Sequence, residues 1–406
     1  MRLAPSLAAL LTFLFVATAS SFAADSTPKA TPFDQVQALM DSLRAKALPA
    51  PKPFGENEED LFEAMAGGVV PVDPAFCERI KLIEITDGLL PMLKQPIPGL
   101  SETTSQLSGN ILGCRLFVLR GLLHCQQGKV AEGQTWLMKP RLMARRPGAD
   151  QSLIQLLVAI AMDAIGQQAA ANYVEIWSEE DRLAYIKSSE SLTPLGSLHN
   201  AILLDGDAFP EKDRMRTMIV EFKSLTPAQQ RERLGKNLSP AFPGPELRKE
   251  REDFITLHLD IITNLTPETW DKLVKDSADE LAPLTKEKVA AFASRNADAK
   301  KRLAAETSQP ADKAPPRLAG EERAKVLYRV LMGPGAEGIG RSRLNQDLKA
   351  TLLIMAMRKG AAFDDSCLTN LTAADGKPLT LGKHNGVKAI LVPGSDAPFL
   401  IIGPVK

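Results

Sequence analysis

The chain has few aromatic residues and no excess of charge of either sign. Its 406 residues include 15 Phe, three Trp and three Tyr, and 49 Lys and Arg residues balance 49 Asp and Glu residues. Nucleic-acid binding usually needs a basic surface, and single-strand platforms need exposed aromatic rings on which bases stack. The composition therefore predicts no nucleic-acid partner, and it also disfavours sugar-stacking clefts.

Cysteine is scarce, and the four cysteines (Cys77, Cys114, Cys125 and Cys367) are too scattered for a disulfide framework. In one straight helix Cys114 and Cys125 would lie about 16 Å apart, whereas a disulfide requires Cα atoms within roughly 7 Å. A disulfide between Cys77 and either of these two stays open in an oxidising compartment. Buried free thiols are the favoured interpretation.

Catalytic and metal-binding motifs are also lacking. The four histidines are His124, His199, His258 and His384; none of them forms a metal-ligand pair such as H-x-x-x-H, and Ser197 has no G-x-S-x-G context. Gly333 to Gly338 has the spacing G-x-G-x-x-G, but a helical pattern precedes it where a dinucleotide site needs a strand. We expect a helix–helix turn there, and we predict no catalytic, cofactor-binding or metal-binding residue.

Long hydrophobic runs are missing except near the N-terminus. Arg2 precedes an apolar run from Leu7 to Val16, and Ser21-Phe22-Ala23 follows with small residues where a signal peptidase cleaves. We predict a signal peptide over residues 1–23 and a mature protein that is periplasmic or secreted. No later run reaches the roughly 18 residues of a membrane span, so none is expected after cleavage.

Helical periodicity dominates what is present, above all between Ile111 and Ile186. Two amphipathic helices joined at Gly128 resemble a single tetratricopeptide-like hairpin, but no second copy occurs at a period near 34. Leu153 to Ile165 then contains only two polar residues. As a helix it rises only about 20 Å, which favours a core helix over a membrane span.

Asp163 is the unusual residue in this apolar helix. A buried carboxylate needs a partner, and Arg115 or Arg120 of the preceding helix are the candidates for a structural ion pair. Alternatively, Asp163 forms a water-facing stripe with Gln155 and Ala159. A catalytic carboxylate is the third interpretation.

Near the N-terminus, Phe33 to Ala47 has a helical pattern that Pro49, Pro51 and Pro53 end, and a helix is expected over Cys77 to Leu93.

The remaining chain divides by composition into helical and mixed regions. The C-terminal pattern is a helix over Arg341–Lys359 and three short strands packed on it, with the turn at Asn385-Gly386. We predict a mainly α fold: an irregular multi-helix array with a small C-terminal α+β region. The predicted segments are a signal peptide (1–23), an N-terminal helical domain (24–205), a charged helical region (206–307), a linker (308–317) and a C-terminal helix plus meander (318–406); the expected strands are Leu379–Leu381, Val387–Val392 and Phe399–Ile402.

Four short runs carry resemblances to known families. Gly376-Lys377-Pro378-Leu379 and the closing Ile402-Gly403-Pro404 resemble the C-terminal part of major pseudopilin-like domains. Leu116–Leu123 and Leu153–Ile165 are similar to the helical region of a group of uncharacterised exported bacterial proteins. The pseudopilin pattern has an acidic residue where this chain has Pro404-Val405, and it begins with an apolar assembly helix. The resemblance therefore implies a pseudopilin-like fold for the C-terminal tail more than a role in a secretion filament.

These observations predict an exported, non-enzymatic interaction or scaffold protein of the cell envelope with protein partners. The prediction rests on the signal peptide, the amphipathic helices and the lack of an assembled catalytic motif. One alternative is a hydrolase-like envelope enzyme whose site combines residues far apart in the sequence. Another alternative is a component of a pseudopilin-like assembly.

Overall fold

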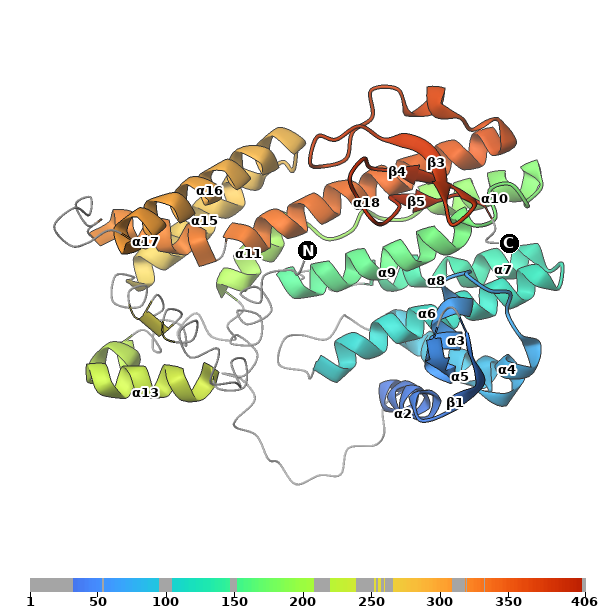
Figure 1. Cartoon of the computed structure of the whole chain (residues 1–406), viewed down its shortest axis with the longest axis horizontal. Coiled ribbons are helices and arrows are strands. Elements are labelled where there is room, and N and C mark those ends of the chain that lie inside the picture. Colours follow the sequence, from blue (N-terminus) through green and yellow to red (C-terminus); the bar gives the residue numbers. More distant parts are fainter. Residues whose placement is uncertain are drawn as a thin grey trace. The chain divides into compact units, whose positions relative to one another are not determined.

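A computed structural model describes most of the chain beyond the N-terminal segment (Figure 1). The described residues are 32–52, 55–94, 104–146, 152–207, 220–238, 266–308, 320–331 and 333–403, with isolated positions at 252, 255, 256, 259 and 318. The predicted signal peptide and nearly all of the predicted linker lie outside them. The described chain is mainly helical with a small C-terminal antiparallel sheet, which confirms the predicted fold class.

Two compact units make up the chain, and their boundaries differ from the predicted domains. The smaller unit contains Leu198–Gly340, and the larger unit contains Pro28–Ser197 together with Arg341–Lys406. The C-terminal meander was predicted as part of a separate region, but it belongs to the same unit as the N-terminal helices. Local composition could not reveal this, because the contacts join segments that are distant in the sequence.

The larger unit is built around α6, against which several shorter helices pack. Its helices are α2 (Pro32–Arg44), α3 (Glu58–Ala66), α4 (Pro74–Arg79), α5 (Leu82–Leu89), α6 (Thr104–Gln126), α7 (Val130–Leu137), α8 (Lys139–Met143), α9 (Leu153–Ala171), α10 (Glu179–Glu190) and most of α18 (Gly333–Lys359), with short 3-10 turns η1 (Leu90–Lys94), η3 (Gly360–Ala362) and η4 (Asp365–Leu368).

The predicted hairpin around Gly128 is formed by α6 and α7. Gly128 has φ +76°, a left-handed conformation that glycine adopts without strain at the end of a helix. Glycines also let the two helices approach closely: a Cβ on Gly133 would lie 2.3 Å from Cys125 Sγ, and one on Gly121 would lie 2.8 Å from Leu137. Small residues at these positions therefore determine how tightly α7 packs on α6.

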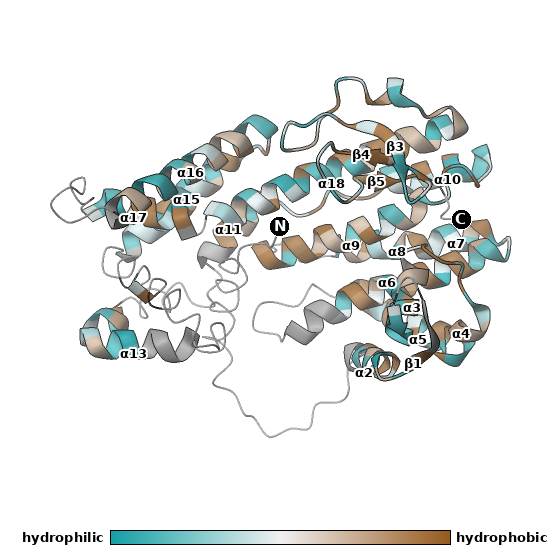
Figure 2. Cartoon of the chain, viewed as in Figure 1, coloured by the Kyte–Doolittle hydropathy of each residue, from teal (hydrophilic) through white to brown (hydrophobic). Residues whose placement is uncertain are grey.

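The apolar helix predicted from Leu153 is α9, and Ser152 caps it. The Ser152 hydroxyl accepts from Gln155 N, and the Gln155 side chain accepts from Ser152 N, which satisfies two amide groups of the first turn. By length and composition α9 would suffice to cross a membrane, yet 61% of its apolar window is buried within the protein. Figure 2 shows hydrophobic colours along much of α9. These features are those of a core helix.

Local irregularities near the N-terminus differ from the sequence-based expectation. A hairpin of β1 (Ala47–Lys52) and β2 (Gly55–Asn57) replaces the expected proline-rich break after α2. Proline is compatible with such a two-stranded ribbon because an edge strand leaves amide positions unpaired. The single helix expected over 77–93 is divided into α4 and α5 at Lys81, whose φ is 55°.

The C-terminal meander is confirmed. Strands β3 (Thr380–His384), β4 (Val387–Leu391) and β5 (Leu400–Ile401) form an antiparallel sheet in the order β3-β4-β5, with Asn385-Gly386 at the tight turn. Both turn residues have positive φ, 51° and 81°, as this hairpin requires. The sheet contacts α18, because Lys349 Nζ lies 5.1 Å from the centre of the Phe399 ring.

A contact with α9 was not predicted for the meander. Gln168 of α9 donates through Nε2 to Ile401 O at 3.0 Å and accepts from Ile401 N at 3.2 Å. One glutamine side chain thus satisfies both backbone groups of an edge residue in β5. The meander is therefore held by α9 as well as by α18.

The smaller unit consists of charged helices with a limited aromatic core. Its described helices are α11 (Leu198–Asp207), α13 (Pro227–Leu238), α15 (Pro267–Leu281), α16 (Lys286–Ser308), α17 (Gly320–Leu331) and the first turns of α18. The Trp270 and Tyr328 rings pack edge to face with centres 5.3 Å apart. Arg329 covers the buried Phe292 ring and pairs with Glu280, which joins α15, α16 and α17.

Candidate functional site

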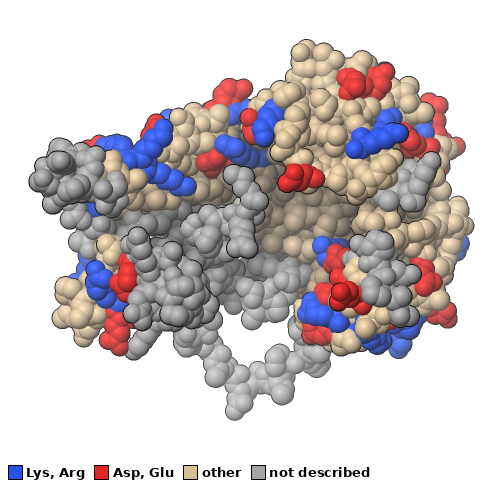
Figure 3. Space-filling model, in the orientation of Figure 1, with Lys and Arg blue, Asp and Glu red and all other residues tan. Residues whose placement is uncertain are grey.

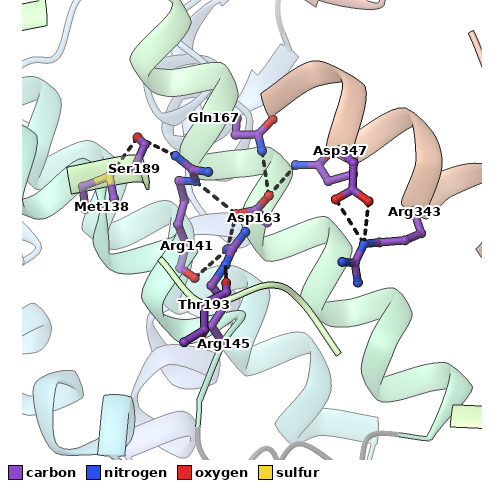
Figure 4. Close-up of polar contacts among 10 residues, drawn as sticks. Met138, Arg141, Arg145, Asp163, Gln167, Ser189, Thr193, Arg343 and Asp347 are labelled. Atoms are coloured by element: carbon purple, nitrogen blue, oxygen red, sulfur yellow. Dashed lines mark hydrogen bonds and ion pairs between the residues drawn. The ribbon is translucent and has the colours of Figure 1, made fainter. Parts of the chain in front are cut away.

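A group of buried polar side chains surrounds Asp163 of α9 in the larger unit (Figure 4). Asp163 is 1% exposed. The first arginine that contacts it, Arg141, lies on α8, and the second, Arg145, follows that helix one turn later. Glutamines from α9 and α18 complete the group. We call Arg141, Arg145, Asp163, Gln167 and Gln346 the Asp163 cluster.

Four donors occupy the two carboxylate oxygens of Asp163. Oδ1 accepts from Arg141 Nε at 3.1 Å and from Arg145 Nη1. Oδ2 accepts from Gln167 Nε2 at 2.7 Å and from Gln346 Nε2 at 2.8 Å. Since a carboxylate offers about four acceptor positions, these four donors saturate it.

The two arginines are themselves held by other acceptors. Arg141 Nη1 donates to Ser189 Oγ at 2.8 Å, which links α8 to α10. Arg145 Nε donates to Thr193 O at 2.6 Å, and Arg145 Nη1 donates to Arg141 O at 2.9 Å. These bonds fix both guanidinium groups in place, so the positive charge beside Asp163 is preorganised.

Asp163 is a carboxylate in the folded protein. Burial by itself raises its pKa, but Arg141 and Arg145 and the donated hydrogen bonds outweigh burial and hold the pKa below its ordinary value. A carboxylate with a lowered pKa and four bound donors is a poor general base, because it has little basicity and no free lone pair facing a substrate. The arrangement therefore serves as a structural centre that ties α8, α9 and α18 together.

The structure corrects the predicted partners of Asp163. Burial with arginine pairing was expected, but Arg115 pairs with Glu63 and Arg120 pairs with Asp87 at 2.6 Å. Both arginines lie on α6, and their ion-pair partners come from α3 and α5. The arginines that pair with Asp163 of α9 come instead from α8 and the turn that follows it. Helical spacing alone does not specify which neighbour a face contacts, so the sequence identified the bundle but not the pair.

The true partners of Asp163 are indicated in part by their spacing in the sequence. Arg141 and Arg145 are four residues apart in the segment directly before α9, and Gln167 follows Asp163 by four residues. Residues at this spacing share a helix face and can act on one group. Gln346 could not be found in this way, because 183 residues separate it from Asp163. The water-facing stripe of Gln155, Ala159 and Asp163 is also wrong, since all three are buried.

The described histidines do not join the Asp163 cluster. His199 lies in the smaller unit, where its Nε2 is 3.1 Å from Asp279 Oδ1 and its Nδ1 is 3.3 Å from Asn200 Oδ1. His124 Nδ1 lies 3.3 Å from Glu132 Oε2 on the α6–α7 hairpin, and burial lowers the pKa of His124 despite that carboxylate. Both nitrogens of His199 therefore face polar neighbours within its own unit, and His258 lies outside the described residues.

The G-x-G-x-x-G run differs from the expected helix–helix turn. Gly333 to Gly338 forms the first turns of α18, and α17 ends just before it at Leu331. A helix therefore precedes the run, and the strand of a dinucleotide site is not found at this place. The glycines contribute to the beginning of the long helix α18.

The cysteines are all free thiols, so the structure contains neither disulfide that the sequence left open. Burial raises the pKa of Cys77 to about 12 and the pKa of Cys125 to about 11, which makes both thiols unreactive near neutral pH. Within the described ranges, His, Cys, Asp and Glu side chains form no group of three that could hold a metal ion.

Comparisons with known proteins add no identification. No protein-family model, curated protein or solved structure matches the chain. The chemistry of its own residues is therefore the basis for assigning a function.

Proposed function

We propose that this chain is an exported, non-enzymatic interaction protein of the cell envelope that binds another protein. The observation that carries the non-enzymatic part is the saturation of Asp163. Asp163, which the sequence offers as a candidate catalytic carboxylate, accepts hydrogen bonds from four donors and is 1% exposed. Its environment favours stability of the fold over acid–base catalysis.

The charges on the surface agree with protein partners better than with nucleic acid. Figure 3 shows Lys and Arg interspersed with Asp and Glu over the visible face, without a large area of one sign. The chain as a whole carries 49 basic and 49 acidic residues. A mixed surface of this kind gives selective pairing with another mixed surface, whereas counterion release from a nucleic acid requires clustered cations.

Export is tested by the N-terminus of the protein recovered from cells. The apolar run ending at Val16 and the small residues at 21–23 support cleavage that leaves Ala24 or Asp25 first. Fractionation followed by N-terminal sequencing is expected to recover this mature form outside the cytoplasm. Protein that is found in the cytoplasm and still begins with Met1 would contradict the export part.

Partner binding is tested by crosslinking in intact cells with a membrane-permeant amine-reactive reagent. The exposed lysines of the larger unit, such as Lys81 and Lys129, offer attachment points for it. We expect a discrete adduct heavier than the 44.0 kDa chain that contains one reproducible second protein. Recovery of only the uncrosslinked chain over a range of reagent concentrations would contradict the interaction part.

A further inference from the structure

The half-buried Trp136 of α7 has two cations near its ring, one from α6 and one from α8. The guanidinium carbon of Arg120 is 3.6 Å from the centre of the Trp136 ring, and Lys139 Nζ is 5.8 Å from it. Ile83 of α5 is 56% exposed, and its backbone oxygen accepts from Arg120 Nη1 at 3.3 Å. We call Ile83, Arg120, Trp136 and Lys139 the Trp136 patch.

Packing within the protein accounts for only part of this arrangement. Arg120 is neutralised by Asp87 at 2.6 Å and also donates to Thr86 Oγ1 at 2.7 Å, so it fixes α6 against α5. Phe117 packs against Trp136 from below the surface, with ring centres 5.8 Å apart. The exposed side chain of Ile83 and the ammonium group of Lys139 have no comparable role in the core.

Lys139 is the cation left for a partner. Within the part of the chain that the structure describes, no carboxylate lies within ion-pair distance of its ammonium group. Its half-buried position has already removed part of its water, and this burial lowers its pKa. A partly desolvated cation gains more from an incoming carboxylate than a fully hydrated one, because less water must be displaced.

The residue types of the patch are those that contribute most energy to protein–protein interfaces. Tryptophan and arginine dominate such contacts, especially where neighbouring apolar groups exclude water from them. Here an arginine already held by Asp87 presents a rigid surface next to the Trp136 ring. Binding of a partner over the patch would therefore cost little conformational entropy in the side chains of this protein.

We propose that the Trp136 patch is the docking surface for a protein partner that presents an acidic side chain next to an apolar one. The acidic group pairs with Lys139, and the apolar group covers Trp136 and Ile83. This inference rests on the proposed function and names the chemistry of the partner. A polyanion such as nucleic acid fits less well, because Asp87 is 52% exposed at the edge of the patch.

Quenching of tryptophan fluorescence tests the accessibility and the charge of the patch. Trp177 and Trp270, the other two tryptophans, are only 3% and 9% exposed, so Trp136 dominates the quenchable signal. We expect iodide to quench about threefold more strongly than caesium at low ionic strength, because two cations lie near the ring. Lys139→Gln should reduce the difference in quenching strength between iodide and caesium. Trp136→Phe should remove the quenchable component of the fluorescence. Equal quenching by both ions in the wild type would overturn the charge argument.

Site-specific photocrosslinking tests the partner. The probe is p-benzoylphenylalanine in place of Ile83, introduced into the full chain in the native cell, where the exposed position tolerates a large side chain. We expect one heteromeric adduct whose yield falls at least tenfold with Lys139→Glu and severalfold with Lys139→Gln. Lys129→Glu is the matched control, because Lys129 is an exposed lysine of the same hairpin outside the patch. It should leave the yield unchanged.

The outcomes separate this inference from the proposed function. An amine-crosslinked partner that gives no adduct at position 83, or gives one unaffected by Lys139→Glu, overturns the patch and leaves the interaction role intact. An adduct with a second copy of this chain also overturns it. Absence of any adduct with either reagent overturns both. Support requires that the adduct peptide of the partner contains an acidic residue beside an apolar one.

Discussion

At the scale of single residues, Asp163 shows how a buried charge can stabilise a fold without taking part in chemistry. Removing an ion from water is costly, and the cost is offset only where the charge is both paired and fully hydrogen-bonded. Two arginines and two glutamines provide that compensation here. The cluster therefore contributes to stability and also specifies which faces of α8, α9 and α18 meet.

Asp163→Asn should destabilise the larger unit strongly. The amide cannot neutralise Arg141 and Arg145, and its own NH2 group would face the donors of Gln167 or Gln346. The expected cost is about 3–5 kcal/mol, or a decrease of roughly 10 °C in the melting temperature. Asp347→Asn is the matched control, because Asp347 is 57% exposed beside Arg343 (Figure 4) and should cost about 1 kcal/mol or less. Equal melting of both variants and wild type would show that the cluster adds no stability.

The pH dependence of this difference has a defined sign. The pKa of Asp163 is lowered in the folded protein from the ordinary value of 3.8, so unfolding takes up a proton at acid pH. Its contribution is complete above that ordinary value and is lost as the pH falls through the lower folded value. The gap in melting temperature between wild type and Asp163→Asn should be constant between pH 6 and pH 8, as estimated from the unperturbed carboxyl titration. It should narrow only well below about pH 4, and a gap that narrows already near pH 6 would contradict the lowered pKa.

At the scale of elements, the first turns of α18 combine helical structure with a sequence that disfavours it. Gly333, Gly335, Gly338 and Gly340 occur within eight residues. Glycine in a helix interior costs about 1 kcal/mol relative to alanine. A Cβ added at Gly335 or Gly338 would meet no atom within 4 Å, so packing does not require glycine at either position. These turns are therefore less stable than they would be with alanine at Gly335 and Gly338. In the sequence they lie next to the boundary between the two units.

Alanine substitutions at these glycines of α18 should distinguish the effect of helix propensity on stability from the effect of packing. Gly335→Ala and Gly338→Ala should each stabilise the protein by roughly 0.5–1 kcal/mol and slow amide exchange over residues 333–340. Gly333→Ala is the control, because its Cβ would lie 2.3 Å from Asn296 Oδ1 and should destabilise instead. The measurement is hydrogen exchange combined with thermal melting. Faster exchange in the Gly335→Ala variant would contradict this view of α18.

Other elements show which sequence signals are sufficient to predict local structure. The α6–α7 hairpin and the β3–β4 turn were predictable, since Gly128 and Asn385-Gly386 adopt conformations that few other residues tolerate. The β1–β2 hairpin was missed because its prolines indicate a break unless the chain returns to form an edge pair. Local chemistry thus predicts turns better than it predicts pairing.

At the scale of the whole molecule, sequence patterns identified the helical class but not the division into units. The meander joins the larger unit through Gln168 and Ile401, which are 233 residues apart. Likewise, burial of Asp163 followed from its apolar helix, whereas Gln346 and the choice between arginine pairs depended on packing between distant segments. Contacts of this kind arise from the complete fold, and no single helical pattern contains them.

One measurement distinguishes most directly a buried cluster that stabilises the fold from a surface that performs the function. It is the yield of the position-83 photoadduct in Asp163→Asn and in Lys139→Glu, each compared with wild type at a temperature where melting curves show both variants folded. We predict that Asp163→Asn, although less stable, keeps the wild-type yield, and that Lys139→Glu lowers it at least tenfold. The opposite pattern, with the adduct lost in folded Asp163→Asn and kept in Lys139→Glu, would place the function in the Asp163 cluster and contradict the proposal.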